Sequence, residues 1–198
     1  MKALIIVDVQ NDFLPGGALA VENGNEVLPI INKVQEEYSL VVATQDWHPE
    51  NHKSFASQHK EKKTFDEIQL RGQKQILWPD HCIQQSWGAE FSKELKQNQI
   101  EAIFRKGLDP TIDSYSGFFD NGKLKSVGLG DYLKGRSIDE VHICGLAADF
   151  CVYYTAKDAL ELGFRTKIIE NATKAINSSN FQNLKKEFEN IGGRIIQK

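Results

Sequence analysis

The sequence has few of the features that mark secreted, membrane-bound or nucleic-acid-binding proteins. Its 198 residues include only three cysteines, Cys82, Cys144 and Cys151. An odd number of cysteines at irregular spacing does not form the framework of a disulfide-rich secreted protein, so we expect them to be reduced. The N-terminal apolar run is broken by Asp8 and is too short for a signal peptide or a membrane span. We therefore expect a cytoplasmic protein.

An excess of one charge sign is also missing. The 24 Lys and Arg residues and 27 Asp and Glu residues are spread along the chain and leave a net charge of -3. This distribution argues against a nucleic-acid or membrane partner and favours a small-molecule substrate, with monomer and homodimer both open. The five prolines and 15 glycines gather into no linker, so we predict a single domain over residues 1–198.

Short apolar runs rich in branched residues alternate with longer stretches of helical period. That alternation predicts an α/β fold with a mainly parallel sheet. The predicted strands are Ala3–Val9, Leu40–Thr44, Glu101–Arg105, Glu140–Cys144, Thr166–Ile169 and Arg194–Ile196. The predicted helices are Asn25–Tyr38, Ala89–Gln97, Phe150–Leu162 and Phe181–Ile191.

Reactive residues recur at the ends of the predicted strands. Asp8 ends the first strand, Asp46 follows the second and Lys106 follows the third. After the fourth strand, a turn leads through Cys151 into a predicted helix. Ligands of open α/β sheets bind beyond the carboxyl ends of the strands, so these four side chains are expected to share one rim.

Cys151 is the candidate nucleophile of this rim. Unpaired N–H groups at a helix start, together with Lys106, would favour its thiolate and could hydrogen-bond a developing oxyanion. Taken alone, a cysteine at a helix start is more often a small buried apolar residue. The convergence with Lys106 and Asp8 favours a catalytic role, in which Asp8 exchanges protons near neutrality because burial and Lys106 act on its pKa in opposite directions.

A second cluster contains metal-type ligands. Asp46 and His48 project to the same side of an extended segment, and His81 from a distant loop would complete a set of three protein ligands with open positions. Either histidine alone would more often be a surface or hydrogen-bonded residue. His52 could be a fourth ligand, a partner of a ligand or a polar lid residue, and the pattern does not decide between these roles.

Motifs along nearly the whole chain combine these residues. They are Asp8-Val9-Gln10-Asn11-Asp12-Phe13, Asp46-Trp47-His48-Pro49, Trp78-Pro79-Asp80-His81-Cys82, Lys106-Gly107, Ser114-Tyr115-Ser116-Gly117-Phe118 and the turn that ends in Cys151. In this combination the chain resembles the nicotinamidases, also called pyrazinamidases, of the isochorismatase-like cysteine hydrolase superfamily. The resemblance implies a three-layer α/β/α fold with a mainly parallel six-stranded sheet.

The resemblance also implies an activity and roles for residues. The activity is hydrolysis of nicotinamide and pyrazinamide, at the carboxamide C–N bond, through a cysteine thioester, in the salvage of NAD. The implied triad is Asp8, Lys106 and Cys151; the implied metal ligands are Asp46, His48 and His81; and the implied substrate-binding residues are Phe13, Trp78 and Tyr115. The metal is expected to be zinc, with iron or manganese as alternatives. A cis peptide bond is expected before Ala147, whose N–H would join that of Cys151 in the oxyanion hole.

Two other functions remain open at this point. A related isochorismatase or N-carbamoyl amidohydrolase could use a similar scaffold, although the set of Asp46, His48 and His81 is expected of nicotinamidases. From a different class, the chain could be a non-catalytic metal-binding module in which Cys151 is merely packed.

Overall fold

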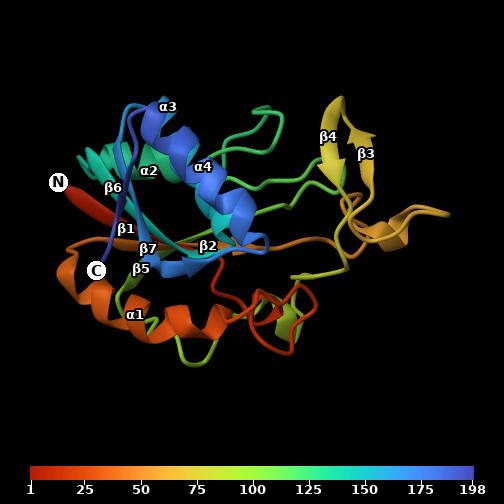
Figure 1. The fold of residues 1–198 in the computed structure, drawn as a ribbon, viewed down its shortest axis with the longest axis horizontal. Helices are drawn as coiled ribbons and strands as arrows, with labels where there is room; N and C mark the ends of the chain where they lie inside the picture. The colour runs from red at the N-terminus through yellow and green to blue at the C-terminus, as the bar shows by residue number, and fades with distance from the viewer.

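A parallel sheet of six strands forms the centre of the protein, whose computed structural model describes all 198 residues (Figure 1). The strands are β1 (Lys2–Val7), β2 (Val41–Asp46), β5 (Ile100–Lys106), β6 (Glu140–Leu146), β7 (Arg165–Lys174) and β8 (Arg194–Ile196). Their order is β5-β2-β1-β6-β7-β8, and every neighbouring pair is parallel. The predicted α/β class and all six predicted strands are confirmed.

Helices cover both faces of this sheet. Along β1, Leu4 and Ile6 pack with α1 (Val27–Val34) on one face. Ile5 and Val7 pack on the other face with α2 (Leu129–Gly135), α3 (Tyr153–Glu161) and α4 (Ser178–Asn190). Burial on both faces explains why β1 is apolar without alternation. The three-layer arrangement is confirmed, and none of its helices has the length and apolar character needed to cross a membrane.

The helix predicted over Ala89–Gln97 is wrong. A single 3-10 turn, Trp87–Ala89, begins this region, and the chain then runs without a helix. Its backbone pairs with the segment after β1: the N–H of Asn11 donates to the carbonyl of Glu90, and the N–H of Ser92 donates to the carbonyl of Val9. These long-range bonds use groups that a helix would need for itself, so tertiary pairing overrides the local helical period.

Two elements were not predicted from the sequence. One is α2, which has only seven residues. The other is an antiparallel hairpin of β3 (Glu67–Leu70) and β4 (Gln73–Ile76), which lies at the end of the molecule opposite the two chain termini (Figure 1). Arg71 and Gly72 connect its strands with φ of 50° and 80°, the left-handed pair that two-residue hairpin turns require.

Candidate active site

Four reactive side chains meet at the carboxyl ends of the central strands, as the sequence predicted. Asp8 follows β1, Asp46 ends β2, Lys106 ends β5, and Cys151 lies in a π-helical turn, Ala148–Val152, between β6 and α3. All four are buried, with exposed fractions between 0% and 6%. Groups that prefer water are therefore held together away from water, an arrangement that is typical of catalytic sites.

The Lys106 ammonium is the centre of this cluster. Its Nζ lies 2.8 Å from Asp8 Oδ2, 2.5 Å from Asp46 Oδ1 and 3.3 Å from Cys151 Sγ, and it donates to the Ser114 carbonyl at 3.0 Å. Burial would lower the pKa of Lys106, but the two carboxylates outweigh it and raise the pKa well above its usual value. Lys106 is therefore a fixed positive charge beside the sulfur.

Asp8 is the group in this cluster that is suited to proton exchange. Burial raises its pKa above the ordinary range, against the opposing charge of Lys106. Its Oδ1 accepts a hydrogen bond of 2.6 Å from Thr44 Oγ1, a contact that the sequence analysis did not find. The backbone of Asp8 is left-handed, with a φ of 47°, which aspartate tolerates better than most residues.

Opposing influences act on the Cys151 thiol, since the helix start and Lys106 seen in the sequence would favour the thiolate. Burial raises its pKa well above the usual value and outweighs the attraction of Lys106. An acceptor for the thiol proton is close. One carboxylate oxygen of Asp8, one of Asp46 and the sulfur of Cys151 all lie within 4.8 Å of one another. The thiol can therefore be activated by proton transfer to a neighbouring carboxylate.

The turn that carries Cys151 has the features expected of it. The peptide bond between Leu146 and Ala147 is cis, as the resemblance predicted. The N–H of Ala147 donates no hydrogen bond within the protein. Asp149 anchors the turn, because its two carboxylate oxygens accept hydrogen bonds of 2.9 Å from the N–H groups of Ile176 and of the next residue. A free backbone donor is thus held close in sequence to the nucleophile.

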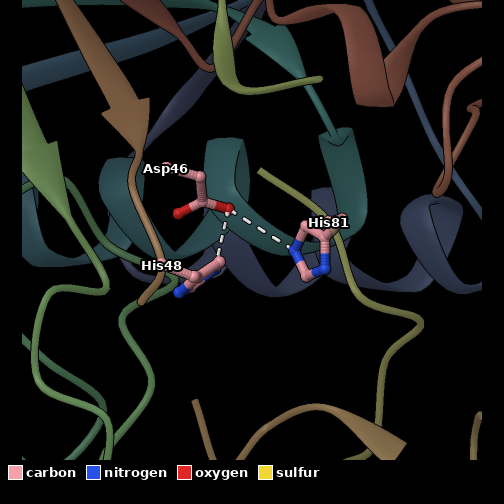
Figure 2. Close-up of side chains that lie close together, drawn as sticks. All are labelled: Asp46, His48 and His81. Carbon is pink, nitrogen blue, oxygen red and sulfur yellow. Dashed lines mark ion pairs between the residues drawn. The ribbon is translucent and has the colours of Figure 1, made fainter. Parts of the chain in front are cut away.

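Asp46, His48 and His81 converge beside this cluster (Figure 2). Asp46 Oδ2 lies 3.6 Å from His48 Nε2 and 3.8 Å from His81 Nε2. The opposite nitrogens face backbone carbonyls: Nδ1 of His48 lies 3.0 Å from the Gly107 oxygen, and Nδ1 of His81 lies 2.8 Å from the Pro79 oxygen. With a proton on each Nδ1, both Nε2 atoms present a lone pair on the side of Asp46, where a metal ion could bind.

This group fits a divalent metal ion. Ligands about 2.0–2.2 Å from a tetrahedral ion lie roughly 3.3–3.6 Å apart, close to the separations found here. Burial would raise the pKa of Asp46, but Lys106 and His48 hold it well below its usual value, so the carboxylate is ionised. A Cβ on Gly107 would lie 2.3 Å from the His48 ring, so only glycine allows this position of the imidazole.

His52 lies behind His48, with ring centroids 4.4 Å apart. Its Nδ1 lies 2.7 Å from Ser54 Oγ and its Nε2 lies 3.3 Å from the Ile112 oxygen. Burial, followed by the charge of His48, lowers its pKa to about 4, which keeps the ring neutral. Ligand atoms of His52, His48 and Asp113 lie within 4.8 Å of one another, whereas His52 is not part of the set formed by Asp46, His48 and His81.

A small aromatic cavity of about 20 Å³ opens beside Cys151. Its walls are Phe13, Leu19, Asp46, Trp78, His81, Asp113, Tyr115, Ala147, Phe150, Cys151 and Ile176. All three side chains expected to bind substrate are among them.

Four wall residues were missed from the sequence, namely Leu19, Asp113, Phe150 and Ile176. Asp113 and Phe150 each lie next to or near a recognised motif, and that adjacency was the available signal. Leu19 and Ile176 come from loops that only the tertiary fold brings to the cavity.

The sequence-family model of the isochorismatase domain matches residues 2–198 of this chain. This chain belongs to the isochorismatase family. The nicotinamidase of Escherichia coli (strain K12) is 46% identical over 180 residues, which are 89% of this chain and 84% of the relative. The predicted resemblance to nicotinamidases is therefore confirmed.

Solved structures of family members agree with this placement. A nicotinamidase and pyrazinamidase of Acinetobacter baumanii superposes with a TM-score of 0.97 at 44% identity, covering 99% of this chain and 95% of that one. A pyrazinamidase of Pyrococcus horikoshii, solved in complex with zinc, superposes with a TM-score of 0.81 at 37% identity, covering 100% and 99%. The family of this fold thus includes a member that binds a divalent metal.

Proposed function

We propose that this chain is an amidohydrolase that converts nicotinamide, and also pyrazinamide, to the corresponding acid and ammonia. The observation that carries the proposal is the buried contact of Lys106 with both Asp8 and Cys151 at the wall of an aromatic cavity. The names of the related nicotinamidases supply the substrate class. The proposed role of the reaction is salvage of NAD.

The proposed cycle begins with transfer of the Cys151 thiol proton to Asp8. The sulfur then forms a bond to the carboxamide carbon, and the N–H groups of Ala147 and Cys151 hydrogen-bond the oxyanion. Asp8 returns the proton to the leaving nitrogen as the C–N bond breaks, and ammonia departs. Asp8 next takes a proton from a water molecule as its oxygen attacks the thioester carbon; the C–S bond then breaks, Asp8 returns the proton to the sulfur, and the carboxylic acid departs. Throughout, Lys106 stabilises the negative charges on Asp8 and on the sulfur.

Asp46, His48 and His81 are proposed to hold one divalent metal ion, which we propose to be zinc. When bound, the ion would supply a Lewis acid for the ring nitrogen of the substrate. Iron and manganese use the same imidazole and carboxylate ligands, so metal analysis of the purified protein decides between the three. We propose that His52 orients His48 and does not bind the metal, since both of its ring nitrogens contact protein atoms.

The aromatic side chains Phe13, Trp78 and Tyr115 are proposed to enclose the heterocycle. Their rings make edge-on contacts in the site. The ring centroids of Phe13 and His81 lie 5.6 Å apart, and those of Trp78 and Tyr115 lie 6.3 Å apart. We propose further that residues 1–198 form a single hydrolase domain, which the family match over residues 2–198 supports. A cytoplasmic location is proposed from the three free, buried cysteines.

The test is ammonia release from nicotinamide, pyrazinamide and an N-carbamoyl amino acid, with the metal content measured on the same preparation. Turnover of the first two substrates supports the proposal. Turnover of the N-carbamoyl compound alone would assign the chain to another branch of the family. Absence of turnover of all three compounds by metal-loaded protein would favour a non-catalytic metal-binding module.

A further inference from the structure

The β3–β4 hairpin carries one side chain that differs from all the others. Gln75 has an exposed fraction of 2%, whereas every other residue of the two strands is half-buried or exposed. A hairpin of mostly polar, solvent-facing residues does not need a buried amide for its own stability. The burial of Gln75 therefore points to a role in what lies beneath the hairpin.

The amide of Gln75 reaches the wall of the substrate cavity. Its Nε2 lies 2.7 Å from the Ile76 carbonyl, 2.9 Å from Asp113 Oδ2 and 3.1 Å from the Tyr115 hydroxyl. The carbonyl and carboxylate oxygens have no proton to give, so the nitrogen end of the amide must face this group. Asp113 and Tyr115 line the cavity, whereas Gln75 does not.

Gln75 determines which way the Tyr115 hydroxyl can donate. The hydroxyl oxygen accepts from Gln75 and also from Trp78 Nε1, at 3.1 Å in each case. Both partners are N–H donors, so the two acceptor positions of the oxygen are filled and its own proton remains to be donated. Burial raises the pKa of Tyr115 well above its usual value, which keeps that proton in place.

We propose that Gln75 is a positioning residue that, together with Trp78, presents the Tyr115 hydroxyl as a hydrogen-bond donor to an acceptor atom of the bound substrate. The inference rests on the proposed function and deepens it, because it gives the hairpin a part in substrate recognition. Gln75 itself touches no substrate. Its effect passes through Tyr115.

The first experiment replaces the amide with a smaller apolar side chain, Gln75→Leu, and measures ammonia release from nicotinamide. A hydrogen bond made equally to substrate and transition state lowers KM and leaves kcat unchanged. We expect KM to rise by about five- to tenfold, with kcat within about twofold of the wild type. Gln73→Leu is the matched control, because Gln73 lies on the same strand with its side chain in solvent, and its KM stays at the wild-type value.

A double-mutant cycle separates positioning from a general structural effect. Tyr115→Phe removes the hydroxyl and is expected to raise KM by a similar factor, and Gln75→Leu in that background should then add less than about twofold. Thermal unfolding of each variant checks that it is folded. The proposal is wrong if the fold-changes in KM of the two substitutions multiply in full in the double variant. It is also wrong if Gln75→Leu lowers stability without changing KM. A wild-type protein that releases no ammonia would instead refute the proposed function.

Discussion

The sheet buries ionisable side chains at both of its ends, and the two clusters differ in how their charges are satisfied. At the carboxyl end, Lys106 contacts two buried carboxylates and a thiol. At the amino end, His142 of β6 lies 2.5 Å from the Tyr38 hydroxyl and 2.7 Å from Glu140. Glu140 in turn pairs with the partly exposed side chains of Arg165 and Lys167.

The difference identifies which cluster performs chemistry. Burial lowers the pKa of His142 and keeps it neutral, and its hydrogen bond with Glu140 leads to surface ion pairs. None of these residues lines the cavity beside Cys151, and we interpret their bonds as stabilising the fold. At the carboxyl end, ionisable groups are buried beside a cavity, and burial raises the pKa of both Asp8 and Cys151. Buried charge of this kind costs stability and is retained for function.

Lys106→Met is the substitution that should lower the stability of the protein most. It leaves Asp8 and Asp46 buried without their cation, so we expect the free energy of unfolding to fall by about 3–5 kcal/mol and turnover to fall at least about 100-fold. Denaturant unfolding and ammonia release measure the two effects. Lys125→Met is the control, because its ion pair with Asp109 is largely exposed and should contribute less than about 1 kcal/mol. Equal effects of the two substitutions would contradict the account.

Removal of the metal should affect only the carboxyl end of the sheet. We expect a chelator to lower turnover by about 100-fold and added zinc to restore it, because Asp46, His48 and His81 are proposed to hold the ion. The measurement is ammonia release by protein whose metal content is known. Full activity in verified metal-free protein would remove these three residues from the reaction.

The amino-end cluster should respond in the opposite way. His142→Leu leaves the buried Tyr38 hydroxyl without its partner, so we expect a loss of about 1–3 kcal/mol in the free energy of unfolding. Both kcat and KM for nicotinamide should remain within about twofold of the wild type. A change in KM of tenfold or more would mean that the two ends of the sheet are coupled.

The smallest expected effect is a pH dependence at the amino end. Hydrogen bonds from Lys167 and then His142 lower the pKa of Glu140 from 4.5 to about 2. A carboxyl whose folded pKa is depressed stabilises the protein above its unfolded pKa, so this contribution is lost as the pH falls from about 4.5 toward 2. In Glu140→Gln the loss over that range should be smaller, by less than about 1 kcal/mol. Identical acid unfolding of the two proteins would contradict the assignment.

The strands and the rim could be predicted because they follow from local patterns. Short apolar runs such as Ala3–Val7 are typical of strands buried on both faces, and the position of Asp8 or Lys106 at a strand end follows from the strand itself. The cis bond before Ala147 came from family resemblance and not from any local pattern.

The parts that could not be predicted depend on distant partners. Gln75 is one polar residue in a polar hairpin, and its burial and its contacts with Asp113 and Tyr115 distinguish it from Gln73. The raised pKa of Cys151 depends on burial, which the sequence does not reveal, whereas the nearby charge of Lys106 could be predicted from it. The segment Ala89–Gln97 was wrongly predicted as a helix because its residues have a helical period. Its backbone forms hydrogen bonds with the segment after β1 and not within a helix.

The central claim is that Cys151 is the nucleophile at the carboxyl end of the sheet. Its most direct test is ammonia release from nicotinamide by Cys151→Ala, with folding checked by thermal unfolding and metal content checked by elemental analysis. The account predicts a folded, metal-binding protein whose turnover is at least about 10⁴-fold below the wild type, because no other group can form the thioester. Turnover within about tenfold of the wild type would contradict it.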